Sequence, residues 1–346
     1  MTLANQQMLV LLAFMSALVA TFALTPVARR LAVPLGFIDR PGPRKVHLTP
    51  MPLMGGAAIY AGTVLATVLF SGGTARGQIM AILAGSTLLL VVGMLDDKKM
   101  LHSQLKLMVA MPLAAVILLV NGIHASVLPW SVGDYAVTLI WVVGLTASFN
   151  ILDHMDGLCA GLAVIASGFF VVFAVLGGQY LVAPLGAALL GASLGFLRWN
   201  FKPAKIFMGD GGALLLGFLL ATLGAKLRVP GALPETSWMV PVLILGVPIF
   251  DTTLVTISRL RRGLLPFASP GKDHTAHRLV AFGLGQRSAV LVLYAAAIVL
   301  GLIALCVGRV SVAQAYGVTT GVVLLAILAI VVLERAPYER QEQLRS

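Results

Sequence analysis

Three polar side chains, spaced three residues apart, interrupt an apolar stretch near the middle of the chain. The segment SFNILDHMDGLCAG, residues 148–161, contains Asn150, Asp153 and Asp156. At positions i, i+3 and i+6 these side chains lie near one face of a helix. One acid here could simply cap a helix end. Three oxygen-bearing side chains, flanked by residues apolar enough to lie in lipid, favour a bound cation or a polar substrate.

Two further carboxylates end another apolar run. Asp96 and Asp97 are adjacent in GMLDDKKML, residues 93–101, and neighbouring carboxylates repel each other unless a cation lies nearby. Mg²⁺ prefers such oxygen ligands and commonly accompanies phosphates, and Mn²⁺ is the alternative. The competing interpretation is an interfacial helix cap neutralised by Lys98 and Lys99.

A fourth acidic position lies in a glycine-rich turn. Asp210 belongs to NFKPAKIFMGDGGALLLG, residues 200–217, where an apolar helix is expected to begin. Backbone N–H groups at a helix start favour phosphate, and Asp210 could hold the accompanying metal. Phe207 could stack on a nucleobase or be an ordinary interfacial aromatic. Lys106, further on from the acidic pair, could face phosphate.

Two basic loops offer contacts for anions. Residues 40–56, RPGPRKVHLTPMPLMGG, combine Arg44, Lys45 and His47 with prolines and a Gly-Gly pair. They form either an anion cradle or a plain basic loop. Residues 258–279, SRLRRGLLPFASPGKDHTAHRL, contain His-x-x-His without cysteines and among basic neighbours. Phosphate or pyrophosphate suits this loop better than zinc does.

Asp251, in VPIFDTTLV, is the one acid clearly inside a predicted membrane span. An acid within a span is a functional hypothesis by default. The alternative is a plain ion pair with a loop arginine.

Composition defines the elements that must position these groups. Of 346 residues, 59% are hydrophobic and 11% are charged, against about 25% charged in soluble proteins. Long apolar runs recur from end to end, so we predict an all-α, polytopic membrane protein forming a single domain over residues 1–346. Cys159 and Cys306 are too few for a disulfide framework.

Hydropathy predicts eleven transmembrane helices. They cover residues 7–28, 52–71, 77–95, 104–121, 134–152, 157–177, 179–196, 210–227, 238–257, 287–308 and 312–333. Alternate loops contain 20 of the 24 basic residues, which places the N-terminus outside and the C-terminus in the cytoplasm. Most histidines and acids fall on the same cytoplasmic side. Topology and an anionic partner at the membrane therefore explain the net charge of +11, and nucleic acid is not expected.

Five motifs in this order resemble the polyprenyl-phosphate N-acetylhexosamine-1-phosphate transferase family. They are R-K-x-H-x-x-P-x-P-x-x-G-G (44–56), L-D-D (95–97), N-x-x-D-x-x-D-G-L (150–158), F-M-G-D-x-G (207–212) and D-H-x-x-H-R-L (273–279). The chain departs from the family pattern where His154 replaces a frequent glycine and Ala276 replaces the middle residue of His-x-His-His. The form of the last motif is more similar to the hexosamine branch than to the peptidoglycan translocase.

The resemblance implies transfer of a sugar 1-phosphate from a UDP-sugar to undecaprenyl phosphate, with release of UMP. The sugar is expected to be N-acetylglucosamine or a related N-acetylhexosamine. The reaction would begin a cell-envelope glycan at the cytoplasmic face of the inner (plasma) membrane, and a homodimer is one option for the assembly. The alternatives are transfer from UDP-MurNAc-pentapeptide and, in another class, a secondary transporter. A transporter is expected to show an internal repeat, and the sequence contains no convincing one.

The resemblance also implies residue roles. Asn150 and Asp210 would bind Mg²⁺, or Mn²⁺. The residues expected at the reacting groups are Asp96, Asp97, Asp153, Lys106 and His274. Those expected to bind the substrates are Arg44, Lys45, His47, Asp156, Phe207, Arg262, His277 and Arg278. Among these, Phe207 and Asp156 would contact uracil.

Overall fold

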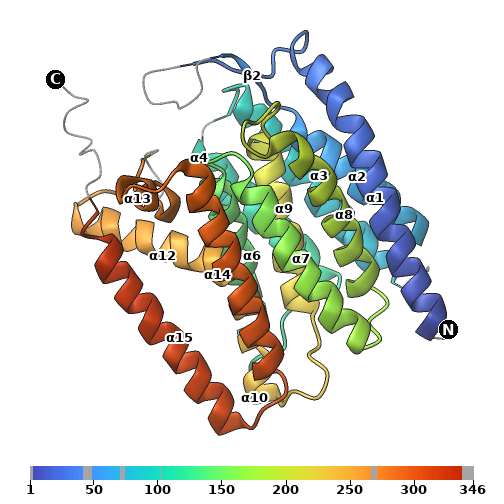
Figure 1. Ribbon diagram of the computed structural model, residues 1–346. Coiled ribbons are helices and arrows are strands. Elements are labelled where there is room, and N and C mark those ends of the chain that lie inside the picture. The colour runs from blue at the N-terminus through green and yellow to red at the C-terminus, as the bar shows by residue number, and fades with distance from the viewer. Residues whose placement is uncertain (1–2, 42–48, 71–74, 102, 266–270, 337–346) are drawn as a thin grey trace. The chain divides into compact units, whose positions relative to one another are not determined.

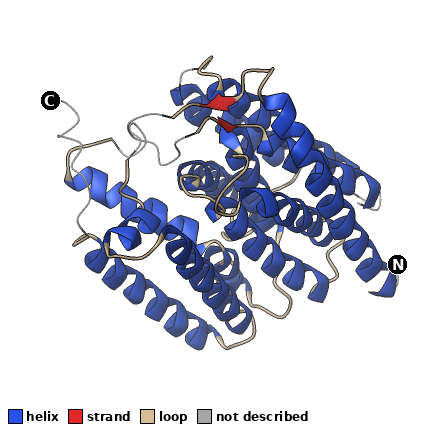
Figure 2. Ribbon diagram, turned by 45° about the horizontal axis from the view of Figure 1, so that its top comes forward, coloured by secondary structure: helices blue, strands red, loops and turns tan. Residues whose placement is uncertain are grey.

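The computed structural model describes residues 3–41, 49–70, 75–101, 103–265 and 271–336. Within these ranges the chain is almost entirely helical, with two short strands (Figure 2). It forms two compact units, residues 1–230 and residues 231–346. The sequence predicted a single domain over residues 1–346, with no boundary at residue 230.

The first unit contains most of the apolar helices. Its helices and strands are α1 (Leu3–Ala32), β1 (Ile38–Asp39), β2 (Met51–Pro52), α2 (Gly55–Phe70), α3 (Arg76–Asp97), α4 (Ser103–Leu105), η1 (Lys106–Ala110), α5 (Met111–Val120), α6 (Ser131–Leu152), α7 (Leu158–Leu176), α8 (Val182–Asn200) and α9 (Gly209–Lys226). The strands pair antiparallel, Ile38 with Pro52 and Asp39 with Met51.

Helix α9 is the centre of the first unit. Its residues from Gly211 to Ala225 are all buried, and it packs against α2, α3, α6, α7 and α8 (Figure 1). A helix that is apolar on every side is stable when other helices surround it. Gly93 of α3 lies against Gly211 of α9 so closely that a Cβ on Gly93 would overlap the backbone of Gly211. The two helices thereby approach at the level where α3 ends in its acidic pair.

A short π-helical turn, η1, precedes α5. The Met111 N–H donates to the carbonyl of Lys106, five residues back, at the end of this turn. The next residue is Pro112, which has no N–H with which to continue the regular ladder. The widened turn begins at Lys106, and such turns frequently occur at functional sites.

The second unit contains α10 (Pro234–Ser237), α11 (Met239–Ile244), α12 (Gly246–Arg261), α13 (Thr275–Ala281), α14 (Gln286–Val307) and α15 (Val312–Leu333). Helices α11, α12 and α13 each contact α14. The segment ending in α11 and the helix α12 meet at an angle of 74°. The prediction of one regular span over residues 238–257 was therefore wrong at its middle. Pro248 has no N–H to donate to the Ile244 carbonyl, and the helix breaks there.

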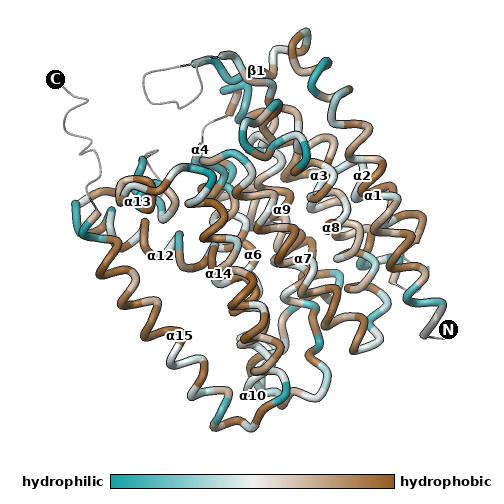
Figure 3. The backbone as a smooth tube through the Cα atoms, viewed as in Figure 1, coloured by the Kyte–Doolittle hydropathy of each residue, from teal (hydrophilic) through white to brown (hydrophobic). Residues whose placement is uncertain are grey.

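The all-α, multi-pass membrane class is confirmed. Seven helices in the described residues are long and apolar enough to cross a membrane, or eight when the bent pair is counted as one span. Each of the eleven predicted spans coincides with helical residues, although α2 and the helix from Lys106 to Val120 are shorter than the others. Hydrophobic residues dominate along α7 and α9, whereas hydrophilic stretches lie near β1 and α4 (Figure 3).

Candidate active site

A lysine and three carboxylates meet in the first unit at the end of α3. The Lys106 ammonium lies 2.6 Å from Asp96 Oδ2 and also donates to Asp210 Oδ2. The backbone N–H of Asp210 donates to Asp97 Oδ1 at 2.9 Å. Helix α3, the nearby η1 and the start of α9, which follows Lys106 by 104 residues, thus supply one charged cluster. Its contacts hold the acidic pair, the lysine and the acid of the glycine-rich turn together.

Gly209 allows the backbone to reach Asp97. Its φ of +73° lies in the left-handed region that favours glycine. A Cβ at this position would be 2.5 Å from Asp97 Oδ2. The glycine-rich turn is therefore needed both for its backbone conformation and for the close approach of a carboxylate. The sequence analysis singled out Asp210 and did not single out the glycine before it.

The Asn150, Asp153 and Asp156 series lies at the C-terminal end of α6 and in the loop that follows. Asn150 is in the last turn of the helix, and Asp153 is the residue directly after it. The prediction that all three share one helical face was wrong for Asp156, because the helix ends at Leu152. Loss of surrounding water, together with the charges of Asp210, Asp97 and Asp156, raises the pKa of Asp153 to about 8.

Asn200 fixes two loops beside this site. Its side chain is buried, its Oδ1 accepts the Gly157 N–H at 3.0 Å, and its Nδ2 donates to the Ile206 carbonyl at 3.0 Å. Asp156 Oδ2 accepts the Ala204 N–H at 3.1 Å. The loop after α6 is thereby tied to the loop before α9. The sequence analysis missed Asn200, although an amide that ends a long apolar helix is a signal for it.

The backbone around Phe207 is held by the segment before α2. The Phe207 N–H donates to the Pro52 carbonyl at 2.9 Å, and the Gly55 N–H donates to the Phe207 carbonyl at 3.0 Å. The Gly56 N–H donates in turn to the Met208 carbonyl at 2.9 Å. The Gly-Gly pair therefore anchors the backbone just before Asp210. The predicted anion contacts from the same motif, Arg44, Lys45 and His47, lie outside the described residues.

In the second unit, Asp273 is the centre of an arginine cluster. The Arg259 guanidinium donates to both Asp273 oxygens at 2.9 Å, and Arg262 Nη2 donates to Oδ2 at 2.6 Å. Burial opposes ionisation, but the hydrogen bond and charge of Arg259 dominate, with help from Arg262. The pKa of Asp273 is lowered to about 2. Arg262, a predicted phosphate contact, thus already has a carboxylate partner within its own unit.

Arg278, also a predicted substrate contact, is fully buried. Its guanidinium donates to the Asp273 carbonyl, the Ser258 hydroxyl and the Leu333 carbonyl at 2.7–2.9 Å. It also lies 2.8 Å from a carboxylate oxygen of Glu334. These contacts join the end of α15 to α12 and to the loop before α13. The structure gives Arg278 a role within the unit and does not support the predicted substrate contact.

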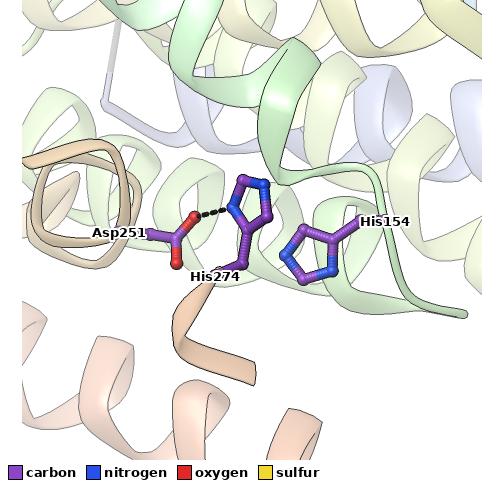
Figure 4. A group of neighbouring side chains, drawn as sticks. All are labelled: His154, Asp251 and His274. Carbon is purple, nitrogen blue, oxygen red and sulfur yellow. Dashed lines mark hydrogen bonds and ion pairs between the residues drawn. The ribbon is translucent and has the colours of Figure 1, made fainter. Parts of the chain in front are cut away.

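The histidines of the last motif differ in their surroundings. His274 Nδ1 lies 2.8 Å from Asp251 Oδ2 (Figure 4), so Asp251, for which an ion pair with a loop arginine was the alternative, has a histidine partner. His277 lies with its ring centroid 6.5 Å from that of His274. Burial and the neighbouring His274 and Lys272 lower the pKa of His277 to about 4. Any phosphate contact by His277 at neutral pH would be made by an uncharged imidazole.

The first-unit cluster has the chemistry of a magnesium site. Its donors are carboxylate oxygens, which Mg²⁺ prefers. Asp97 Oδ2 and Asn150 Nδ2 are buried and have no hydrogen-bond partner among the described residues, although buried polar atoms are nearly always paired. An arrangement of acids in which Lys106 is the only counter-charge that the described residues supply, with unpaired polar atoms beside it, is suited to binding a cation and a polar ligand.

Known proteins resemble the chain over most of its length. A probable undecaprenyl-phosphate N-acetylglucosaminyl 1-phosphate transferase of Bacillus subtilis is 39% identical over 82% of this chain and 81% of its own length. A decaprenyl-phosphate N-acetylglucosaminephosphotransferase of Mycobacterium tuberculosis is 35% identical over 83% and 79%. An undecaprenyl-phosphate alpha-N-acetylglucosaminyl 1-phosphate transferase of Yersinia pestis is 28% identical over 80% and 78%. Residues 79–227 of the chain also match the sequence model of glycosyl transferase family 4. The chain therefore belongs to glycosyl transferase family 4.

Proposed function

We propose that this protein transfers N-acetylglucosamine 1-phosphate, or a closely related N-acetylhexosamine 1-phosphate, from a UDP-sugar to undecaprenyl phosphate and releases UMP. The observation that carries the proposal is the convergence of Asp96, Asp97, Lys106 and Asp210 at the ends of apolar helices. Relatives at 39% and 35% identity are named as N-acetylglucosamine-phosphate transferases of undecaprenyl phosphate and decaprenyl phosphate, respectively.

Attack of one phosphate on another requires neutralised charge and alignment. Lys106 can exchange a carboxylate partner for a phosphoryl oxygen, since its ammonium contacts both Asp96 and Asp210. Asp96 and Asp97 are on the acceptor side in this proposal. A bound Mg²⁺, held by Asn150 and Asp210 with Asp153 in support, would neutralise the diphosphate of the donor. The lipid phosphate is largely ionised at neutral pH, so no strong base is required.

The donor would be bound by its base and by its diphosphate. Phe207 is partly exposed and is proposed to stack on uracil, with Asp156 as the hydrogen-bonding partner. His274, His277 and Arg262 are the proposed contacts of the diphosphate and sugar. The D-H-x-x-H-R-L motif and the names of the relatives favour N-acetylglucosamine over UDP-MurNAc-pentapeptide.

We further propose eleven transmembrane segments, with the N-terminus outside and the C-terminus in the cytoplasm of the inner membrane. The uneven distribution of basic residues among the loops supports this orientation. The same orientation puts the acidic cluster on the cytoplasmic side, where a water-soluble nucleotide sugar would be available. A homodimer is compatible with this arrangement.

Release of UMP tests the proposal directly. Purified protein is incubated with undecaprenyl phosphate, Mg²⁺ or Mn²⁺, and a panel of UDP-sugars. We expect UMP with UDP-N-acetylglucosamine and none after chelation of the metal. Asp210→Asn should abolish transfer and leave the protein folded in detergent. Asp134→Asn is the matched control, because Asp134 is buried and accepts the N–H groups of Val127 and Leu128, both at 2.8 Å. Absence of UMP with every donor would overturn the proposal.

A further inference from the structure

Asp251 is a buried acid in the first half of helix α12. It lies on α12, is 1% exposed, and uses both carboxylate oxygens toward the segment that begins α13. Oδ1 accepts the backbone N–H of Thr275 at 2.7 Å, and Oδ2 lies 2.8 Å from His274 Nδ1. A buried carboxylate is costly unless hydrogen bonds satisfy it, and these two contacts do so.

The two contacts have different consequences. His274 precedes α13 and provides no side-chain cap for it, so the bond from Thr275 makes Asp251 the cap of this helix. The bond to the imidazole is not needed for that purpose. A carboxylate only accepts hydrogen bonds, so it places the proton of His274 on Nδ1. It also fixes the plane of the ring, and Nε2 becomes the nitrogen that points away from Asp251.

We propose that Asp251 is a positioning residue for His274. It holds the proton on Nδ1 and fixes the ring orientation, so that the imidazole, once protonated at Nε2 as well, donates from Nε2 to a phosphoryl oxygen of the substrate while the carboxylate balances its positive charge. This inference rests on the proposed function, in which His274 contacts the diphosphate of a UDP-sugar. Asp251 itself touches no substrate and acts through the imidazole. Residues 271–274, which precede α13 and have no regular structure, can then present a histidine in one defined geometry.

Asp251→Asn separates the two contacts. Asparagine keeps Oδ1 for the Thr275 N–H and so retains the cap of α13. Its Nδ2 amide can only donate, so Nδ1 of His274 must become the acceptor and the proton moves to Nε2. The same exchange of carboxylate for amide beside a catalytic histidine acts by tautomer reversal in serine proteases. The variant should therefore fold, and because the amide requires Nδ1 as an acceptor, the imidazole should no longer be able to carry a proton on both nitrogens.

The first measurement is the position of the imidazole proton. The ¹⁵N resonances of His274 are recorded in histidine-labelled protein at about pH 9, where an ordinary imidazole is neutral. They are assigned by their loss in His274→Gln. We expect Nδ1–H in the unaltered protein and Nε2–H in Asp251→Asn. Asp134→Asn, which changes a buried acid in the first unit, should leave the His274 signals unchanged. An identical tautomer with Asp and with Asn at position 251 would overturn the inference.

The second measurement is a double-mutant cycle on UMP release. Asp251→Asn should lower kcat/KM for the UDP-sugar by about 10- to 100-fold, because misplacement of a contacting group has effects of this size. In the His274→Gln background the same change should alter kcat/KM by less than about twofold, because the imidazole through which it acts is gone. An equal loss in both backgrounds would overturn the inference. If no donor yields UMP, the proposed function fails, and the tautomer measurement still decides whether Asp251 controls His274.

Discussion

Replacing Gly209 by alanine tests how closely the glycine-rich turn must fit against Asp97. The Cβ of alanine would lie 2.5 Å from Asp97 Oδ2, whereas real Cβ atoms essentially never come within 3.0 Å of another heavy atom. The carboxylate must therefore move by at least 0.5 Å, the difference between these two distances. Any such movement disturbs the bond of 2.9 Å from the Asp210 N–H to Asp97 Oδ1.

The cost has two parts. Alanine at a φ of +73° is strained by about 1 kcal/mol. Loss of a hydrogen bond to a carboxylate adds about 1.5–3 kcal/mol. We expect Gly209→Ala to lower the free energy of unfolding by roughly 2.5–4 kcal/mol. The displaced carboxylate should lower transfer by about 100-fold.

Gly178→Ala provides the control. Gly178, in the turn between α7 and α8, has a φ of +61°, and a Cβ there would meet no atom within 4 Å. Gly178→Ala should lower the free energy of unfolding only by the backbone strain, about 1 kcal/mol. Its transfer rate should be close to that of the unaltered protein. Unfolding in detergent and UMP release are measured on both variants. Equal transfer rates in Gly209→Ala and Gly178→Ala would refute the role assigned to the close approach at Asp97.

Three further predictions concern buried contacts. Arg278→Met should destabilise the second unit by about 3–5 kcal/mol because it leaves buried acceptors unpaired. Arg261→Met, at a side chain 67% exposed, should cost less than about 1 kcal/mol, and unfolding curves distinguish the two. Asn200→Leu should cost about 2–5 kcal/mol by leaving an N–H and a carbonyl buried without partners, and a loss below 1 kcal/mol would contradict this. The folded pKa of Asp273 is about 2 against an ordinary 3.8. Asp273 therefore contributes roughly 2 kcal/mol to the free energy of unfolding above about pH 4, and this contribution is lost as the pH falls toward 2. The Asp273→Asn variant should not show this loss in unfolding curves.

Hydropathy was sufficient to predict the helices because burial in lipid requires long apolar segments with internally paired backbones. The exception is the segment over residues 238–257. Its Gly246 and Pro248 were visible in the sequence, but proline is also common in intact membrane helices. The missing bond from Pro248 to the Ile244 carbonyl separates α11 from α12 in the setting of the folded protein, and the sequence alone does not show that setting.

The charged cluster could be predicted as a group but not in its contacts. Asp96, Asp97 and Asp210 were expected together because each lies at the same end of a predicted span. That Lys106 contacts two of them depends on the π-helical turn and on the packing of α3 against α9. Arg278 could not be predicted in the same way. Its motif suggested a substrate contact, whereas its side chain is fully buried among partners of its own unit. Burial depends on what surrounds a side chain, and the sequence around Arg278 does not reveal that α15 ends beside it.

The charge of the first-unit cluster explains why such a site would need a cation to bind its substrates. Asp96, Asp97 and Asp210 are held near one another with Lys106 as the only cation that contacts them among the described residues. A UDP-sugar and a lipid phosphate are both anionic, so the cluster by itself would repel them. Burial, together with the same repulsion, raises the pKa of the neighbouring Asp153 to about 8. A divalent cation would reverse it, lowering that pKa and attracting phosphate in one step. Binding of Mg²⁺ should therefore release a proton near neutral pH. Titration calorimetry in two buffers of different ionisation enthalpy would measure this release, and proton uptake or no change would contradict the assignment.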